Sequence, residues 1–367
     1  MIKTIAVLEG DGIGPEITRE GLKVLDVIAE KFNHKFIYNK APFGAESYFK
    51  FKSSFPEETK KICDEADVII KGPVGLSVEK MELIPLEFRP ENGAILPLRK
   101  RYDTFANFRP VYLPKELSFF SPLKEDIIKD GIDILMIREL VGGIYFGDKI
   151  EGQETNNEYS NDKCIYNRAE IIRIARVAFK EAMKKNKQLT NVHKANVLAT
   201  SRFWNSIIEE VKIEYPEVKY NSILVDNAAF QLVKNPAQFN GVMLLENMQG
   251  DILTDQAGGI LGSLGLMPSA CMGPEKSYVE PAHGSAPDIG GKNVANPYSM
   301  IGSVALMLEK CFDLNEEAEL IWDSMIKLFK KGFRTIDLAD KDTEKSKILS
   351  TSEFGDKVTE NIRLFKG

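Results

Sequence analysis

Short apolar segments rich in β-branched residues alternate with longer amphipathic segments along this chain, and this alternation constrains its fold more than any other feature. An apolar run of about four to eight residues has the length of a buried strand, whereas apolar residues recurring every three to four positions mark one face of a helix. Strands alternating with helices favour an α/β protein with a largely parallel sheet. The strand candidates are residues 4–8, 66–71, 133–138, 191–194 and 242–246, and the helix candidates are 16–32, 168–185, 202–214 and 305–311.

Length and composition narrow the class of protein. The 367 residues favour about two domains. The net charge of −6 is spread along the chain without a dominant basic patch, so neither nucleic acid nor an anionic membrane is an expected partner. No apolar run approaches the ~18 residues of a membrane span, and the first one is too short for a signal peptide. The four cysteines are far apart, which favours a reducing compartment, and we expect a cytoplasmic protein.

Three glycines, Gly10, Gly12 and Gly14, lie between the first strand candidate and the first helix candidate. A dinucleotide-binding turn has the order G-x-G-x-x-G, but here Pro15 stands in the place of the third glycine. Proline suits the first turn of a helix, where its missing N–H costs little. We therefore expect a tight strand-to-helix turn rather than a Rossmann cofactor site.

Two aspartates, Asp251 and Asp255, are four residues apart in "GDILTD". On a helix their side chains would share one face about 5–6 Å apart, where two like charges repel each other. Mg²⁺ or Mn²⁺ between them would relieve this repulsion, although a solvated helix face is the simpler explanation of the pair alone. Asp226, after the strand-like run 222–225, adds a third carboxylate where α/β folds place their sites.

Three arginines, Arg99, Arg109 and Arg138, occur in apolar surroundings at the expected ends of strands or helices. Guanidinium groups bind carboxylates with fixed geometry, so the three together favour a substrate with two carboxylates, although a surface ion pair explains any one of them. Tyr145 in "GGIYFG" and Lys194 in "HKANVL" could move protons, although packing or solvation explains each taken singly.

The segment "EPAHGSAPDIGGKNVANP", residues 280–297, is long, irregular and rich in Gly, Pro and Asn. Loops of this length are usually mobile or wrapped around a ligand. Its backbone could hold a flat ring. Asp288 could accept a hydrogen bond from a ribose 2′-hydroxyl and would repel a 2′-phosphate.

Several motifs together carry a resemblance to a known family. They are "LEGDGIGPE", "RELVGGIYFG", "HKANVL", "VDNAAFQLV", "GDILTD" and the 280–297 segment, which extend nearly from end to end of the chain. The chain resembles the β-decarboxylating dehydrogenases of isopropylmalate, isocitrate, homoisocitrate and tartrate, and "GGIYFG" and "LPLRK…FANFRP" are most similar to the isopropylmalate branch. The resemblance implies a two-domain isopropylmalate/isocitrate dehydrogenase-like α/β fold with a parallel-containing sheet, different from the Rossmann fold. It further implies a discontinuous cofactor-side domain, 1–105 plus 262–367, around a substrate, metal and dimerisation domain, 106–261.

The resemblance also implies an oxidoreductase of leucine biosynthesis that uses NAD and Mg²⁺ or Mn²⁺. It would convert (2R,3S)-3-isopropylmalate to 4-methyl-2-oxopentanoate, NADH and CO₂. Tyr145 and Lys194 would be catalytic. The homodimer would share its active sites, with Lys194 and Asp226 reaching the site of the second subunit. The substrate residues would be Arg99, Arg109, Arg138, Asp226, Ile95, Leu96 and Val197; the metal ligands Asp226, Asp251 and Asp255; and the NAD-binding residues Glu91, Glu280, His283, Gly284, Ser285, Ala286, Pro287, Asp288, Ile289 and Asn296.

Four departures from the family pattern surround the expected site. The usual "GGPKW" loop is replaced by "GPVGLSVEKMELIP", Val141 stands for a common Thr, His193 for a common Asp, and Gln249 for an aromatic residue. Two alternatives therefore stay open. One is the same reaction on another substituted malate or on tartrate, and the other is a catalytically silent regulatory paralogue.

Overall fold

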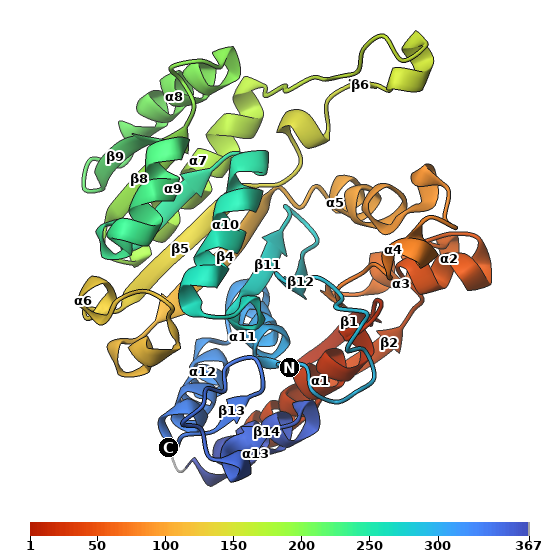
Figure 1. Cartoon of the computed structure of the whole chain (residues 1–367), viewed down its shortest axis with the longest axis vertical. Helices are drawn as coiled ribbons and strands as arrows, with labels where there is room; N and C mark the ends of the chain where they lie inside the picture. Colours follow the sequence, from red (N-terminus) through yellow and green to blue (C-terminus); the bar gives the residue numbers. More distant parts are fainter. Residues whose placement is uncertain (366–367) are drawn as a thin grey trace. The chain divides into compact units, whose positions relative to one another are not determined.

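The computed structural model describes residues 1–365 and divides the chain into two compact units. The first unit comprises Met1–Tyr102 together with the chain from Gly262 onward, and the second unit comprises Asp103–Leu261. Each unit contains strands of its own with helices packed against them (Figure 1). The predicted alternation of strands and helices is confirmed.

Five strands of the first unit follow the order β2-β1-β3-β12-β11. All of these neighbours are parallel except the last pair, which is antiparallel. The four residues of β3 and the second half of β1 are buried, as is typical of parallel strands covered on both faces. The strands are β1 (Ile2–Leu8), β2 (Lys35–Lys40), β3 (Val68–Lys71), β11 (Pro268–Met272) and β12 (Tyr278–Pro281).

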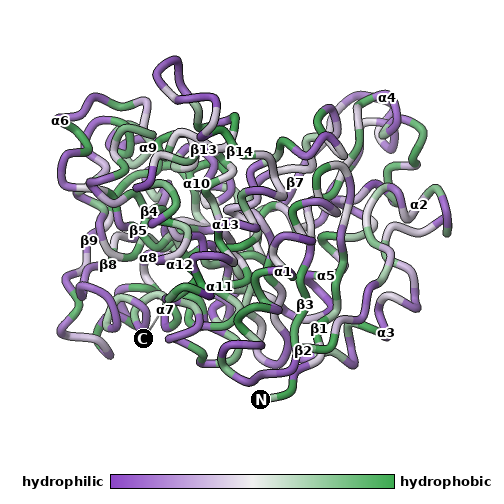
Figure 2. The backbone as a smooth tube through the Cα atoms, turned by 90° about the horizontal axis from the view of Figure 1, so that it is seen from below, coloured by the Kyte–Doolittle hydropathy of each residue, from purple (hydrophilic) through white to green (hydrophobic). Residues whose placement is uncertain are grey.

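Four long helices of the first unit pack against one another: α1 (Gly14–Phe32), α11 (Tyr298–Phe312), α12 (Asn315–Lys330) and α13 (Thr351–Leu364). The most buried of them is α11, whose apolar stretch is green in Figure 2. None of the helices in residues 1–365 is long and apolar enough to cross a membrane. The smaller elements are α2 (Ala45–Phe51), α3 (Glu57–Glu65), α4 (Val78–Met81), a π-helix (Glu91–Ile95), α5 (Leu96–Tyr102), β13 (Arg334–Thr335) and β14 (Ile348–Leu349).

The strands of the second unit follow the order β4-β5-β10-β8-β9, with β4 antiparallel to β5 and the other pairs parallel. Helices α9 and α10 lie on one side of these strands, and α7 and α8 lie on the other (Figure 1). The strands are β4 (Ala106–Leu113), β5 (Ile132–Glu139), β8 (Gln188–His193), β9 (Lys219–Leu224) and β10 (Gly241–Leu245). The other elements are α6 (Glu125–Ile128), the hairpin β6 (Lys149–Ile150) and β7 (Asn161–Asp162), α7 (Arg168–Lys184), α8 (Ala199–Lys212), α9 (Val225–Lys234) and α10 (Asn247–Leu261).

The glycine-rich segment after β1 is a tight turn into α1, as expected. Gly10 and Gly12 have φ angles of 73° and 58°, and a Cβ atom on Gly10 would lie 2.1 Å from the carbonyl oxygen of Pro73. Asp11, between the two glycines, is buried, and its carboxylate accepts hydrogen bonds from the backbone N–H groups of Ala45, Glu46 and Gly75. The turn therefore connects three segments of the first unit.

Asp226 follows a strand, as expected. The strand β9 ends at Leu224, one residue earlier than the predicted run 222–225, and Asp226 lies in the first turn of α9. The β-branched Val225 extends the strand-like pattern, but the acidic Asp226, with Ala228 and Ala229 close behind it, favours the start of a helix.

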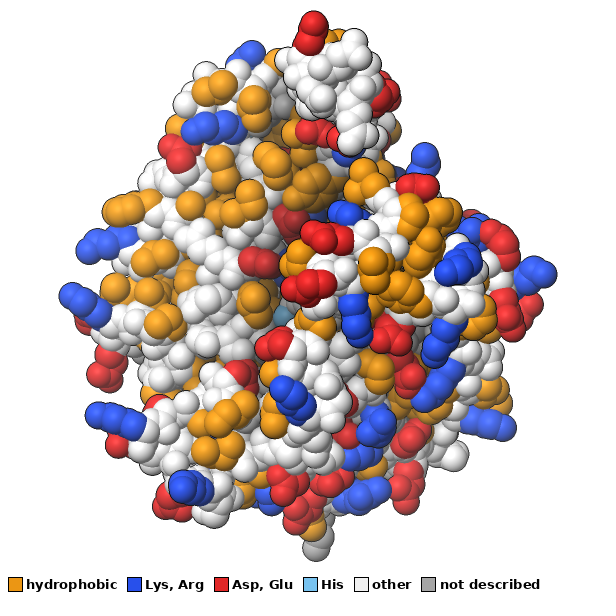
Figure 3. Space-filling view, turned by 45° about the vertical axis from the view of Figure 1, so that its right-hand side comes forward, with side chains coloured by type: hydrophobic (Ala, Val, Ile, Leu, Met, Phe, Trp, Pro, Cys, Tyr) orange, Lys and Arg blue, Asp and Glu red, His pale blue; other side chains and the backbone are white. Residues whose placement is uncertain are grey.

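The segment that replaces the expected "GGPKW" loop exposes two apolar side chains. Val78 and Leu83 are more than half exposed, as is Leu86 directly after the segment, and Phe49 and Phe51 of α2 are also exposed. Figure 3 shows hydrophobic side chains gathered over this part of the first unit, on the right of that view.

Candidate active site

The "GDILTD" motif lies in α10, so its predicted helical conformation is confirmed. The helix starts directly after β10. The Glu246 carboxylate caps its first turn by accepting hydrogen bonds from the backbone N–H groups of Met248 (3.2 Å) and Gln249 (2.7 Å). Asn247, Asp251 and Asp255 recur every four residues and therefore share one side of α10.

Arg138, near the end of β5, is held against the first turn of α10. Its Nε and Nη2 atoms donate to Asn247 Oδ1 at 3.1 Å and 2.8 Å, and its Nη1 atom forms an ion pair with Asp251. The side chain passes so close to Gly250 that a Cβ atom there would lie 2.7 Å from Arg138 Cγ. Because Arg138 is 1% exposed, its guanidinium has a fixed position beside Asp251.

Arg109 occupies the equivalent place beside Asp255. It was expected at the end of an element, but it lies inside β4. Its Nε atom donates to Asn107 Oδ1 at 2.8 Å, and its Nη1 atom donates to Thr254 Oγ1 at 2.6 Å and to Asp255 Oδ1 at 3.3 Å. Two arginines from neighbouring strands therefore meet the two aspartates of α10.

Tyr145 completes this cluster, because its hydroxyl donates to Asp251 Oδ2 at 2.9 Å. Burial and the nearby Asp251 charge raise the pKa of Tyr145 to about 12, so the phenol stays protonated at neutral pH. Burial also raises the pKa of Asp255. The Arg109 charge opposes this shift, and the Asp251 charge adds to it. The two carboxylates thus repel each other, and a bound cation would relieve this.

Lys194 and Asp226 form a separate pair in the second unit. Lys194 follows β8, and its Nζ atom donates to Asp226 Oδ1 at 2.7 Å. The Lys194 ammonium group lowers the pKa of the Asp226 carboxyl. Residues 1–365 contain no group of three or more His, Cys, Asp or Glu side chains placed to hold a metal ion, so the three expected metal ligands do not converge within one chain. The two carboxylates of α10 are hard oxygen donors on one helix face, which fits Mg²⁺ or Mn²⁺ provided that a further ligand comes from elsewhere.

The remaining expected substrate residues divide between the units. Arg99, on α5 of the first unit, is buried and donates from Nε to the Tyr278 hydroxyl at 3.2 Å. Ile95 and Leu96, one turn before it, are partly exposed. Val197, in the second unit, is 64% exposed.

Five of the ten expected cofactor residues line one cavity of about 320 Å³ in the first unit: His283, Gly284, Ala286, Ile289 and Asn296. Ser263 and Asp337 also line it. The Nε2 atom of His283 is buried and has no hydrogen-bond partner among residues 1–365, so a ligand donor or acceptor could pair with it.

The other five expected cofactor residues are outside this cavity lining. Glu280 forms a buried ion pair with Lys71, and the Ser285 hydroxyl donates to the Gly75 carbonyl. Glu91, Pro287 and Asp288 are exposed.

Several residues that hold the site together were missed by the sequence analysis: Asn107, Asn247, Thr254 and, in the cofactor cavity, Asp337. Asn247 could have been found, since it precedes Asp251 by the same four residues that separate Asp251 from Asp255. The other three carry no comparable signal, because only the fold brings them to the site.

Comparison with known proteins places the chain in a family. The family described as isocitrate/isopropylmalate dehydrogenase matches residues 4–358. The chain is 47% identical to a 3-isopropylmalate dehydrogenase of Halalkalibacterium halodurans, over 99% of this chain and 98% of that protein. It is 46% identical to one of Thermotoga maritima, over 98% of both.

Solved structures agree with the sequence relatives. An isocitrate dehydrogenase from Methylococcus capsulatus superimposes with a TM-score of 0.85 at 29% identity, covering 98% of this chain and 99% of that chain. A β-decarboxylating dehydrogenase from Thermococcus kodakarensis superimposes with a TM-score of 0.78 at 28% identity, covering 100% and 99%. The chain therefore belongs to the isocitrate/isopropylmalate dehydrogenase family of enzymes and has its α/β fold.

Proposed function

We propose that this enzyme catalyses the NAD-dependent oxidative decarboxylation of 3-isopropylmalate in leucine biosynthesis. The observation that carries the proposal is the cluster of Arg109, Arg138 and Tyr145 around the two aspartates of α10. Relatives at 42–47% identity over nearly the whole chain bear the name 3-isopropylmalate dehydrogenase. This supports the choice of substrate within the family.

Arg109 and Arg138, with Arg99 of the first unit, would bind the two substrate carboxylates. Both arginines of the second unit now contact the aspartates of α10, so substrate carboxylates would replace or share these contacts. Ile95, Leu96 and Val197 would form an apolar wall against the isopropyl group. Such a wall would disfavour isocitrate, because it cannot satisfy the extra carboxylate of that substrate.

Asp251 and Asp255, with Asp226 of a second copy of the chain, would hold Mg²⁺ or Mn²⁺. The bound ion would act as a Lewis acid on the oxygen at C2 of the substrate. Burial and, to a smaller extent, the Asp251 charge raise the pKa of Asp255, and a bound cation would offset both effects, which supports a cation site there. Asp226 would also contact the substrate.

Proton movements would fall to Lys194 and Tyr145. Lys194 would take the proton of the C2 hydroxyl while the hydride at C2 passes to NAD, and CO₂ would then leave from C3. Tyr145 would deliver a proton to C3 of the resulting enol. Its hydroxyl keeps its proton at neutral pH, so a proton is available, although the pKa of about 12 makes Tyr145 a weaker acid than an ordinary tyrosine.

NAD would occupy the cavity lined by His283, Gly284 and Asn296, and the neighbouring Asp288 would favour NAD over NADP. The enzyme would act as a homodimer. Phe230 and Val233 of α9 and Ile252 of α10 are exposed apolar side chains that a second copy would cover. The four free cysteines fit the expected cytoplasmic location.

The test is NADH formation, followed at 340 nm, by the purified protein with NAD and Mn²⁺. 3-Isopropylmalate, isocitrate and tartrate are compared in parallel, and NADP and excess EDTA serve as controls. We expect turnover with 3-isopropylmalate and NAD that EDTA abolishes. Faster turnover of another malate or of tartrate would overturn the substrate, and no turnover with any of them would overturn the enzymatic proposal.

A further inference from the structure

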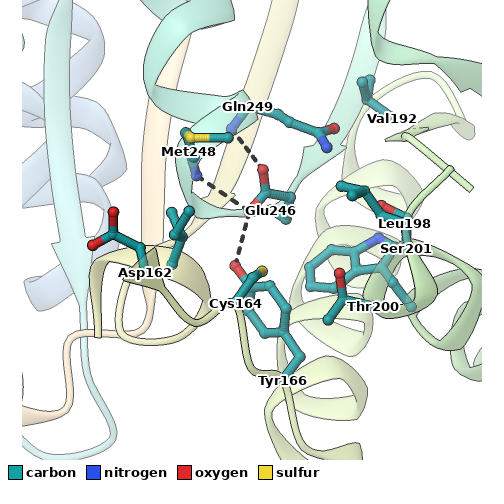
Figure 4. A pocket seen from close by; sticks show the side chains of 12 residues that line it. Asp162, Cys164, Tyr166, Val192, Leu198, Thr200, Ser201, Glu246, Met248 and Gln249 are labelled. Atoms are coloured by element: carbon teal, nitrogen blue, oxygen red, sulfur yellow. Dashed lines mark hydrogen bonds between the residues drawn. The ribbon is translucent and has the colours of Figure 1, made fainter. Parts of the chain in front are cut away.

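The second unit contains a cavity of about 280 Å³ that the proposed reaction does not use. It lies between α8, β8 and the first turn of α10 (Figure 4). Ile144, Val192, Leu198 and Trp204 give it mainly apolar walls. An apolar cavity of about 150 Å³ already admits a molecule as large as benzene, so this one has room for a small ligand.

Gln249, a lining residue of this cavity, has one buried polar atom that is unsatisfied. The residue is 6% exposed, and its Oε1 atom has no hydrogen-bond partner among residues 1–365. Figure 4 shows its side chain extending across the cavity towards Val192. A buried acceptor without a donor is costly, so a ligand that donates to this atom would gain affinity from it.

The charges around the cavity exclude an anion. Among the described residues that line it, none is Lys, Arg or His, and two are acidic, Asp162 and Glu246. The Glu246 carboxylate already accepts hydrogen bonds from the Tyr166 hydroxyl and from two N–H groups of α10. Asp162 is paired with Lys149, so neither carboxylate is left for a cation, and the site suits an uncharged molecule.

We propose that this cavity binds a small uncharged molecule with an apolar body and a single O–H or N–H donor, of about the size of phenol. The donor pairs with Gln249 Oε1, and the apolar body packs against Trp204 and Leu198. This proposal does not depend on the reaction that the enzyme catalyses.

The test uses phenol as the probe and Trp204 as the reporter. The chain has two tryptophans, so a Trp322→Phe background leaves only the one that lines the cavity. We expect phenol to change Trp204 fluorescence saturably, with a matching calorimetric titration. Toluene, which has the same ring without the donor, should bind about tenfold more weakly.

Variants of Gln249 separate this site from others. Gln249→Leu removes the acceptor, and it should weaken phenol about tenfold without weakening toluene. Gln249→Phe fills the cavity and should abolish both. Gln256→Leu is the matched control, because Gln256 lies on the same helix and bonds to the Ala229 carbonyl instead.

A second measurement needs no variant. Cys164 also lines the cavity, so phenol should slow its alkylation, measured by mass spectrometry, while Cys311 in the first unit labels at an unchanged rate. The proposal is overturned if phenol leaves both Trp204 fluorescence and Cys164 labelling unchanged, as it would if a side chain of a second copy filled the cavity. Equal phenol affinity in the Gln249→Phe variant would overturn it as well.

Discussion

Asp251 of α10 and Asp226 of α9 each form an ion pair with a basic side chain, but the surroundings of the two ion pairs differ. Arg138, the partner of Asp251, is 1% exposed and is also held by Asn247. Asp226 and its partner Lys194 have side chains that are 62% and 29% exposed. Asp251 itself is 41% exposed, so the first pair is anchored in the second unit by its arginine, whereas both members of the second pair reach the surface.

This difference indicates how much of the site one chain can fix by itself. A buried guanidinium with several hydrogen bonds cannot move without leaving polar groups unpaired, so the geometry around Asp251 is set by folding. An exposed lysine–carboxylate pair contributes little to stability and can exchange partners at low cost. In the proposed homodimer, the surface pair of one copy would complete the site around Asp251 and Asp255 of the other copy.

The largest expected effect comes from changing the pair that the buried Arg138 anchors. Asp251→Asn keeps the size of the side chain but removes its charge, so the expected metal loses a ligand and Arg138 loses its ion pair. We expect kcat to fall about a thousandfold or more, measured by NADH formation. Asp323→Asn, an exposed position on α12, is the control. Activity within threefold of wild type would exclude Asp251 from the site.

A second test concerns Glu139, which follows Arg138 and is fully buried. Burial raises the pKa of its carboxyl from 4.5 to about 7, although the N–H groups of Val141 and Gly142 oppose this shift. The folded protein thus binds the proton more tightly than the unfolded chain. The free energy of unfolding should therefore fall as the pH rises from about 4.5 to 7, by about 3 kcal/mol in total.

The Glu139→Gln variant cannot titrate and should lack this component. Urea unfolding of both proteins between pH 4.5 and 8 measures the difference in unfolding free energy, which should favour the variant increasingly up to pH 7 and then stay level. Glu319→Gln, at an exposed position of α12, should show no such trend. A difference that is constant with pH would mean that folding leaves the pKa of Glu139 unchanged.

The sequence predicted the parts of the site that depend on local pattern. "GDILTD" lies on a helix, and the alternation of strands and helices is present. The antiparallel strands β4 and β11 were not predicted, because a strand's own residues do not identify its neighbour. Because β4 was not predicted, Arg109 was expected at the end of an element. Its hydrogen-bond partners Asn107 and Thr254 were missed because only the fold brings them to Arg109.

The smallest expected effect tests whether Asp226 works in a second copy of the chain. Asp226→Asn and Asp251→Asn should each be inactive alone. In a mixed dimer, one site would combine the intact Asp251 of one subunit with the intact Asp226 of the other, while the second site would carry both changes. Random mixing after co-expression should then restore about a quarter of wild-type activity, since half of the dimers are mixed and half of their sites are intact.

Mixing Asp251→Asn with Asp255→Asn is the matched control for this experiment. Each of these changes lies on α10 and damages the site of its own chain. Every site in the mixture therefore lacks one ligand, and no activity should return. If the first mixture also stays inactive, Asp226 acts within its own chain, and the contrast between the buried and exposed pairs says nothing about how the subunits share a site.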